Sequence, residues 1–327
     1  MSLACLGCIA KHDHALAELV NKEGALTTAI GFLTHKDLPL RRQSCRLLAC
    51  AVQHDDKAVE WVPSAARANI VETIRAAGGA GDGETGAFAA TVVQQICKRS
   101  TTAAGSFADL RVVPLLVAHI GAGLGSPAAA AAAIGHICDA QSDAAAAAVS
   151  TGAVGAMKAV LERMAPAPIC AVMCAALGAI SYAGENHAST VAASGALQLM
   201  AEATLLSGRK MGPATTALAR KGLAKAVSKC GDYNVLVWLI EALPFTGPAA
   251  EHEVLTALLK AMARLLGAKG SLRLDFMQRG ALTLVQEGKG GSGPLREALK
   301  QLNATYPAQM VAATDPNYES ALLAKIS

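Results

Sequence analysis

The chain has 327 residues, of which 53% are hydrophobic but only 3% aromatic, and its formal net charge at pH 7 is +4. So small a charge does not indicate a nucleic-acid-binding protein, and the alternation of apolar and polar residues that predicts strands is absent. Alanine, the best helix former, contributes much of the hydrophobic fraction. The composition therefore predicts an all-α protein.

The cysteines indicate a reducing compartment. There are nine of them, an odd number, and they are spread through apolar segments with helical spacing. Such residues behave as small core side chains where thiols stay reduced, whereas a disulfide framework is typical of small secreted chains. We expect buried thiols and a location in the cytoplasm.

Seven short apolar segments recur at a nearly constant step. The segments can be aligned on one aliphatic residue each: Ile9, Val52, Ile96, Ile137, Ile180, Val227 and Leu265. In every segment, small or aliphatic residues lie three and four positions before this aligned residue. The steps between the aligned residues are 43, 44, 41, 43, 47 and 38 residues. Residues three and four apart share one face of a helix, and helical units of about 40–47 residues are typical of armadillo and HEAT solenoids.

A glycine fifteen residues after the aligned residue favours the armadillo unit, in which a first helix meets a second at a sharp turn before a long third helix. The glycine is present four times, as Gly24, Gly152, Gly195 and Gly280, while Arg67 and Arg111 replace it twice. We predict an armadillo-type right-handed α-solenoid of about seven repeats over residues 1–287, with a C-terminal capping helix and tail over 288–327.

The solenoid is expected to begin inside a third helix. That helix would leave Leu3, Leu6 and Ile9 without a neighbouring repeat. We interpret these residues as a docking face for another armadillo chain; the alternative is that the sequence is a fragment of a longer product.

The same segment contains Cys5-x-x-Cys8 followed by His12 and His14. These residue types bind zinc in many proteins. Because Cys5 and Cys8 also belong to the repeating apolar stripe, we expect core packing instead, with no metal and no cofactor.

Two glycine-rich stretches, Gly78–Gly86 and Gly288–Gly293, are expected to be loops. Two long uncharged stretches, 112–138 and 164–184, contain prolines and follow the repeat step, so we predict no membrane span. From Gly152 the pattern predicts a second helix at 153–161, a third helix at 169–182 and the next first helix at 185–194.

The sequence does not indicate an enzyme. Its eight histidines are scattered without a recognisable nucleophile beside them, and Gly78–Gly83 lacks the Lys-Ser/Thr of a phosphate loop. We expect no catalytic residues.

Armadillo proteins of the nuclear-import type carry Trp and Asn, four residues apart, on successive third helices. The corresponding pairs here are Ala4/Cys8, Leu47/Ala51, Thr91/Gln95, Ala132/His136, Ala175/Ala179, Gly222/Ala226 and Lys260/Arg264. The ladder that holds an extended basic peptide is therefore absent. The middle of the groove would be shallow and apolar, better suited to contact with a helix of a folded partner.

Six basic residues between positions 209 and 229 form a stripe of positive charge. Lys221, Lys225 and Lys229 are spaced at i, i+4 and i+8, and the rest of the stripe is Arg209, Lys210 and Arg220. It is either a solvated helix face or a surface for an acidic partner such as the tails of tubulin. A second basic cluster, Arg41, Arg42 and Arg46, allows the same two interpretations.

The C-terminal part carries a resemblance to a known family. Its residues include Gly280-Ala281-Leu282, Val285-Gln286-Glu287, Leu295, Leu302-Asn303, Val311, Leu322-Leu323 and the signature Tyr306, Pro307, Pro316 and Tyr318. With the repeat register, this ending resembles the sperm-associated antigen six family, the armadillo proteins of the ciliary and flagellar central pair. The likeness spans the whole chain but only the later half of a typical member.

The resemblance implies a non-enzymatic scaffold of the axoneme in motile cilia and flagella. Such a protein would lie on a central-pair microtubule with copies of itself or longer relatives and would support regulated beating, with no nucleic acid and no membrane as partner. The alternative is a soluble cytosolic armadillo adaptor or transport factor that binds a helix or peptide in its groove as a monomer.

Overall fold

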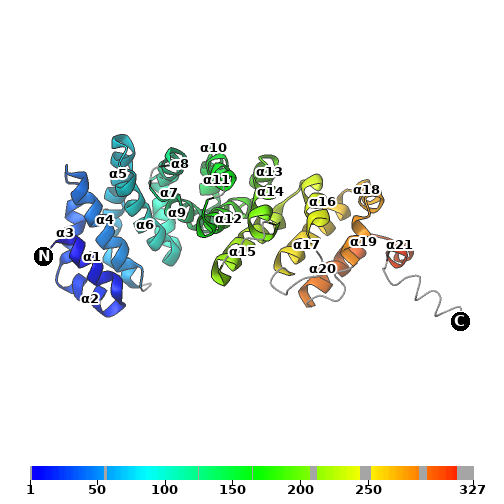
Figure 1. Ribbon diagram of the computed structural model, residues 1–327, viewed down its shortest axis with the longest axis horizontal. Helices are drawn as coiled ribbons and strands as arrows, with labels where there is room; N and C mark the ends of the chain where they lie inside the picture. The colour runs from blue at the N-terminus through cyan, green and yellow to red at the C-terminus, as the bar shows by residue number, and fades with distance from the viewer. Residues whose placement is uncertain are drawn as a thin grey trace. The chain divides into compact units, whose positions relative to one another are not determined.

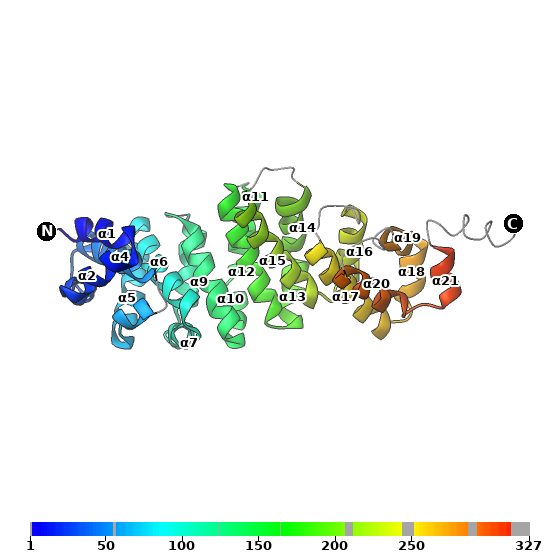
Figure 2. The ribbon, with the colours of Figure 1, turned by 90° about the horizontal axis from the view of Figure 1, so that it is seen from below.

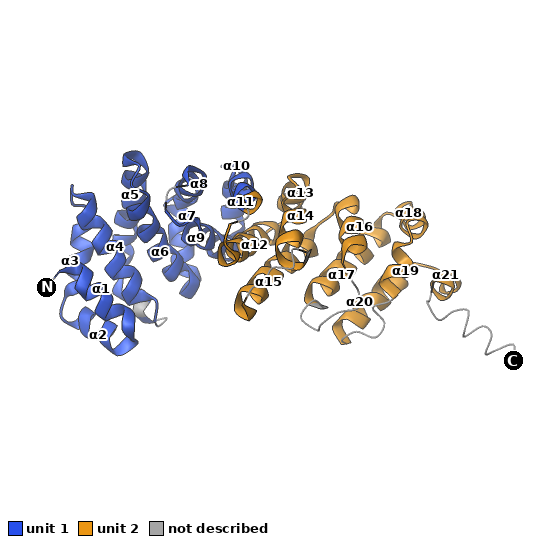
Figure 3. Cartoon of the chain, in the orientation of Figure 1, with its two compact units in different colours: residues 1–160 blue, residues 161–327 orange. Residues whose placement is uncertain are grey.

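The structure is a computed structural model that describes residues 2–54, 57–123, 125–163, 165–206, 212–243, 252–286 and 293–314. Helices are the only regular secondary structure in these ranges, which confirms the all-α prediction. The chain forms two compact units, residues 1–160 and 161–327 (Figure 3), and the boundary falls inside one helix. Each unit is described by itself.

The aligned apolar residues all lie in long third helices that pack on one another within each unit (Figures 1 and 2). In the first unit these helices are α1 (Leu3–His12), α4 (Leu38–Val52), α6 (Gly83–Arg99) and α9 (Pro127–Ala140). In the second they are α12 (Ala167–Tyr182), α15 (Pro213–Lys229), α17 (His252–Ala268) and α20 (Gly293–Asn303). Six of the seven aligned residues are buried, and Ile9 is half-buried. The repeating step in the sequence therefore marks the residues that form the core between successive third helices.

The remaining helices complete the repeats. In the first unit they are α2 (His14–Lys22), α3 (Ala25–Phe32), the 3-10 helix η1 (Lys57–Trp61), α5 (Ser64–Ala80), α7 (Thr101–Asp109), α8 (Val112–Ala122) and α10 (Ser142–Ser150); α11 (Ala153–Glu162) contains the boundary. In the second unit they are α13 (Glu185–Ala193), α14 (Ala196–Ala201), the π-helix η2 (Glu202–Leu206), α16 (Tyr233–Ala242), α18 (Leu272–Gln278), α19 (Ala281–Gln286) and α21 (Ala308–Ala313). The helices predicted from Gly152 onward agree with α11, α12 and α13 to within two residues.

The four predicted turn glycines are confirmed. Gly24, Gly152, Gly195 and Gly280 precede a second helix with φ between 72° and 85°. This left-handed conformation crowds a Cβ against the following carbonyl, so glycine adopts it most easily. Arg111 stands at the same turn with φ 54°, the one non-glycine residue of the described ranges with positive φ.

We expect Arg111→Gly to stabilise the first unit by about 1 kcal/mol, because the glycine relieves the left-handed strain. The matched change at the equivalent turn, Gly152→Ala, should destabilise by a similar amount, since a Cβ there meets no neighbouring atom and only the backbone is affected. Urea unfolding of both variants checks this; two shifts of the same sign would contradict the explanation.

Two predictions about the first unit are wrong. Arg67 does not stand at a turn but lies inside α5, and η1 precedes that helix in place of an α-helical first helix. Residues 78–86 are not a loop, because α5 continues to Ala80 and α6 starts at Gly83. Gly81, with φ 68°, and Asp82, which caps α6, make the corner within two residues.

At the other end, the repeat register continues beyond Gly293. The predicted capping helix exists as α20, but it packs on α17 as a third helix does, after a first and second helix formed by α18 and α19. Helix α21 was not expected. The rest of the predicted tail, residues 315–327, and residues 288–292 of the second glycine-rich stretch lie outside the described residues.

No single helix of the described ranges is both long and apolar enough to cross a membrane. Two bent pairs, α7 with α8 and α10 with α11, reach that length and apolarity only when each pair is taken together.

Candidate functional site

The predicted basic stripe lies on α15 of the second unit. Lys221 is exposed, while Arg220, Lys225 and Lys229 are half-buried. Arg209 and Lys210 lie outside the described residues. Neither α15 nor the preceding third helix, α12, contains an Asp or a Glu.

Two glycines bring α12 and α15 together. A Cβ on Gly178 would overlap the carbonyl oxygen of Gly222 and lie 2.8 Å from its carbonyl carbon. A Cβ on Gly222 would overlap the carbonyl oxygen of Cys174 and lie 2.7 Å from the backbone nitrogen of Ala175. The two backbones are therefore in direct contact, which only glycine permits at both positions.

This contact places an aromatic residue beside the lysines. Tyr182, one turn after Gly178, ends α12 and keeps 51% of its surface exposed. The Nζ atoms of Lys225 and Lys229 lie 5.8 and 5.4 Å from the centre of its ring. Both distances are within the range of cation–π attraction, which holds each ammonium group near the ring.

We did not predict Tyr182 as a site residue, although the repeat register contained the signal. Tyr182 follows Ile180 by two residues, and Lys229 follows Val227 by two, so both occupy the same position of successive third helices. The hydrophobic pattern alone could not identify a tyrosine that is half exposed.

The next third helix adds more positive charge. Lys260 and Arg264 are exposed on α17. The guanidinium of Arg264 donates to the carbonyl oxygens of Ser228, at 2.9 Å, and Cys230, at 3.2 Å. These carbonyls end α15, so Arg264 satisfies acceptors at the negative end of the helix dipole.

Charge separates by helix class in the second unit. The third helices α12, α15, α17 and α20 carry eight Lys or Arg and two Glu: Arg220, Lys221, Lys225, Lys229, Lys260, Arg264, Arg296, Lys300, Glu253 and Glu297. The helices α13, α14, η2, α16, α18 and α19 carry one Arg and four acidic residues: Arg273, Glu185, Glu202, Glu241 and Asp275. The third helices therefore present the positive face.

The positions compared with the Trp and Asn ladder do not all face a groove. Leu47, Ala51, Ala179, Gly222 and Ala226 are buried, and Gly222 lies in the backbone contact with α12. The expectation of a shallow apolar groove at these positions is wrong there, because they pack between helices.

On α1, Leu3, Leu6 and Ile9 are all half-buried, so the predicted docking face stays a prediction. The expectation that Cys5 and Cys8 are core residues is wrong, because both are exposed. A group of three or more His, Cys, Asp or Glu able to hold a metal ion is absent from the described residues. Nearby, His12 Nδ1 lies 3.1 Å from Asp13 Oδ2 and the ring of His14 stacks on Trp61.

Most other cysteines are core residues, as expected. Cys45, Cys97, Cys138, Cys170, Cys174 and Cys230 are buried, and Cys50 is half-buried. Burial raises the pKa of Cys45, Cys97 and Cys138 to about 12 and that of Cys230 to about 11. These groups stay protonated near neutral pH and do not act as nucleophiles.

The second basic cluster is held by internal contacts. Arg41 donates to the carbonyl of His35, and Arg46 Nη2 lies 3.5 Å from Cys8 Sγ. Arg42 Nη2 donates to both carboxylate oxygens of Asp82, at 3.0 and 2.9 Å. The Arg46 and Arg42 contacts tie α4 to α1 and to the start of α6, and the Arg41 contact holds the turn before α4, so we interpret the cluster as structural.

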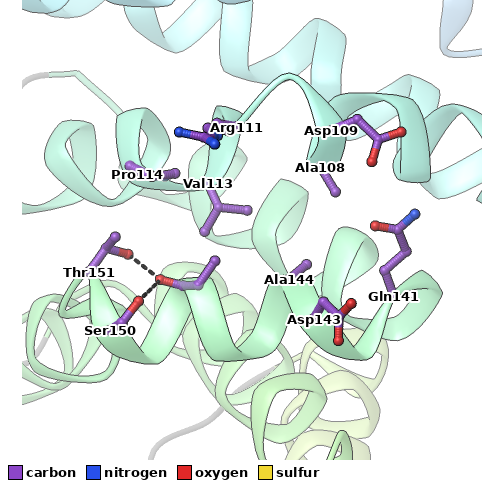
Figure 4. Close-up of a pocket in the computed structure, with 11 residues that line it drawn as sticks. Ala108, Asp109, Arg111, Val113, Pro114, Gln141, Asp143, Ala144, Ser150 and Thr151 are labelled. Carbon is purple, nitrogen blue, oxygen red and sulfur yellow. Dashed lines mark hydrogen bonds between the residues drawn. The ribbon is translucent and has the colours of Figure 1, made fainter.

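A pocket of about 400 Å³ lies in the first unit between the α7–α8 turn and α10 (Figure 4). Arg111, Asp109, Asp143 and the hydroxyls of Ser150 and Thr151 line it. Both hydroxyls donate to the carbonyl of Ala147, so they serve the end of α10. The lining contains no histidine or cysteine that could activate a nucleophile.

Part of the C-terminal signature belongs to the folded second unit. Tyr306 is buried and its hydroxyl donates to the carbonyl of Arg273 at 3.1 Å; burial raises its pKa to about 12. Pro307 precedes α21 as its N-cap residue. Pro316 and Tyr318 lie outside the described residues.

Comparison with known proteins bears on the fold. No family model matches the chain, and no curated protein matches it. Among solved structures, an engineered protein is 16% identical with a TM-score of 0.60, over 98% of this chain and 86% of that one. A designed armadillo repeat protein in complex with the peptide (KR)4 is 15% identical with a TM-score of 0.57, over 68% and 91%.

A third likeness is to a structure from work on the interaction between cadherin and beta-catenin. It is 11% identical with a TM-score of 0.63 and matches 98% of this chain but 62% of the other. At sequence identities this low, the structural similarity shows only that the folds are alike. This chain has the all-α architecture of armadillo repeats.

Proposed function

We propose that this chain is a non-enzymatic scaffold that binds other proteins through the third-helix surface of its repeats. The observation that carries the proposal is the half-exposed Tyr182 ring close to the ammonium groups of both Lys225 and Lys229, on the positively charged helices of the second unit. A half-exposed aromatic residue among cations is typical of binding surfaces. The structural neighbours include one in complex with a peptide and one from work on cadherin and beta-catenin.

More specifically, we propose a place in the axoneme of motile cilia and flagella, in the central apparatus. The partners would be a central-pair microtubule and other armadillo chains. The resemblance of the repeats and of Tyr306-Pro307 and the segment after it to the sperm-associated antigen six family supports this proposal. The second candidate, a monomeric cytosolic adaptor, is favoured by the same exposed Tyr182 surface.

Fractionation of isolated motile cilia tests the location. Detergent removes the membrane and soluble matrix, and a salt wash removes loosely bound proteins from the axoneme. We expect the chain to stay with the salt-washed axoneme. Recovery in the detergent-soluble fraction, or absence from cilia, would contradict the ciliary proposal and favour the cytosolic adaptor.

A docking face on α1 makes a separate prediction. If Leu6 and Ile9 contact another copy of the chain, Leu6→Asp/Ile9→Asp should prevent self-association, because two carboxylates would be buried without partners. Light scattering at several concentrations measures the mass, and circular dichroism checks helicity.

The matched control replaces two exposed apolar residues of the second unit, as Leu274→Asp/Met310→Asp, and should associate like the unmodified chain. Association that survives the Leu6 and Ile9 changes would overturn the docking face. An unmodified chain that stays monomeric at every concentration would favour the adaptor.

A further inference from the structure

Three lysines form a row along α15, and the ring of Tyr182 lies beside the C-terminal half of that row. Lys221, Lys225 and Lys229 are each four residues apart, so they advance by about 6 Å per step. Alternate side chains of an extended peptide point to the same side and lie about 6.6 Å apart. The spacing of the lysines therefore matches that of alternate residues in an extended segment.

The ring of Tyr182 fixes part of this row in advance. The Nζ atoms of Lys225 and Lys229 lie within 5.8 Å of its centre. A side chain already held near its bound position loses less conformational entropy on binding. The ring is also half exposed, so it adds apolar surface beside the two positive charges.

The positive charge around Tyr182 and the α15 lysines determines which kind of peptide can bind there. Helices α12 and α15 add no carboxylate to it, and Lys260 and Arg264 of α17 extend the positive charge. A basic peptide, such as the (KR)4 bound by one structural neighbour, would be repelled. A segment with regularly spaced carboxylates would be attracted.

We propose that Tyr182, Lys221, Lys225 and Lys229 form a binding site for an extended acidic peptide segment with Asp or Glu at alternate positions. The proposal rests on the scaffold function proposed above and names the chemistry of the partner. The carboxylates pair with the lysines, and the ring of Tyr182 holds the ammonium groups of Lys225 and Lys229 near their bound positions. Since the surface is open to water, the attraction weakens with rising ionic strength.

Fluorescence anisotropy with the full chain tests the site. The probe is a labelled peptide of alternating Glu and Ser, compared with a peptide of equal length and equal Glu content that has the Glu residues at every third position. We expect the alternating peptide to bind more tightly and its affinity to fall with salt. Equal affinity for both peptides, or no binding to either, would overturn the proposal.

Variants separate the site from net charge. Lys225→Glu/Lys229→Glu should weaken binding by at least about tenfold, and Tyr182→Ala by about threefold. The control, Lys22→Glu/Lys36→Glu, makes the same charge change at two exposed lysines of the first unit and should stay within about twofold of the unmodified chain. A control that loses as much affinity would overturn the site in favour of general charge attraction. Melting curves confirm that each variant folds.

Failure of this proposal is distinguishable from failure of the scaffold function. A chain that stays with the axoneme but binds no acidic peptide overturns the site alone. A chain that binds the alternating peptide through Lys225 and Lys229 but is absent from cilia supports the site and overturns the ciliary function.

Discussion

Gly222→Ala is expected to destabilise the second unit by about 3 kcal/mol. The added Cβ would overlap the carbonyl oxygen of Cys174, a backbone atom that cannot rotate away. Helices α12 and α15 must then separate along their contact and lose packing on both sides. The expected sign opposes helix propensity, which favours alanine over glycine by about 1 kcal/mol.

The matched control is Gly267→Ala on α17, where a Cβ meets no neighbouring atom. The same substitution should there stabilise the unit, because only the propensity changes. The fluorescence of Trp238 in α16 reports unfolding of the second unit, with Trp61 in the first unit replaced by Phe. A neutral or stabilising Gly222→Ala would contradict the backbone contact between the two helices.

The second large effect is expected at Asp82, which joins α4 to α6 in the first unit. Asp82 caps α6 by accepting from the backbone N–H of Thr85 at 3.0 Å, and it receives both hydrogen bonds of Arg42 Nη2. Its side chain is 15% exposed and that of Arg42 is 26% exposed, so the pair is shielded from water. Removing it deprives α6 of its cap and leaves a guanidinium partly unpaired.

We expect Asp82→Ala to cost about 2–3 kcal/mol and Asp82→Asn about 1 kcal/mol, because asparagine still caps the helix but cannot neutralise Arg42. The control is Asp232→Ala. Asp232 caps α16 through two backbone N–H groups, and its loss should cost about 1 kcal/mol. Urea unfolding measures all three; equal costs for Ala and Asn at position 82 would contradict a role for the ion pair.

The effect at Asp82 should depend on pH. Desolvation is the largest single influence and alone would raise the pKa of Asp82, but the hydrogen bonds from Thr85 and Arg42 together outweigh it and lower the pKa below its usual 3.8. The unfolded chain then takes up the proton more readily, so the stabilisation is complete above about pH 5 and lost as pH falls through 3.8 and below. The difference between the unmodified chain and Asp82→Asn should shrink over that range, which circular dichroism during urea unfolding can follow.

The sequence was sufficient for the repeats because each depends on local chemistry. Residues such as Ile137 and Val227 recur on one helix face since every third helix packs against its neighbours, and glycines recur where the backbone must be left-handed. Arg111 shows the limit of that rule. Arg111 adopts the left-handed backbone conformation without being a glycine, so the residue type at position 111 does not indicate that a turn lies there.

Contacts between helices could not be predicted in the same way. The sequence placed Gly222 toward a groove, whereas the structure places it against the backbone of Cys174. The pairing of Arg42 with Asp82 joins residues 40 apart, and the sequence offered for Arg42 only a solvated surface or a surface for an acidic partner. Tyr182 was missed because its importance depends on Lys225 and Lys229, which belong to the next third helix.

Co-sedimentation with microtubules tests whether the basic third-helix face of this scaffold binds an acidic partner. The full chain is spun with stabilised microtubules before and after limited proteolysis removes the acidic tubulin tails. We expect the unmodified chain to co-sediment with intact microtubules, and we expect this binding to be lost after removal of the tails and in Lys225→Glu/Lys229→Glu. Absence from the intact microtubule pellet, or equal binding with and without the tails, would contradict this expectation.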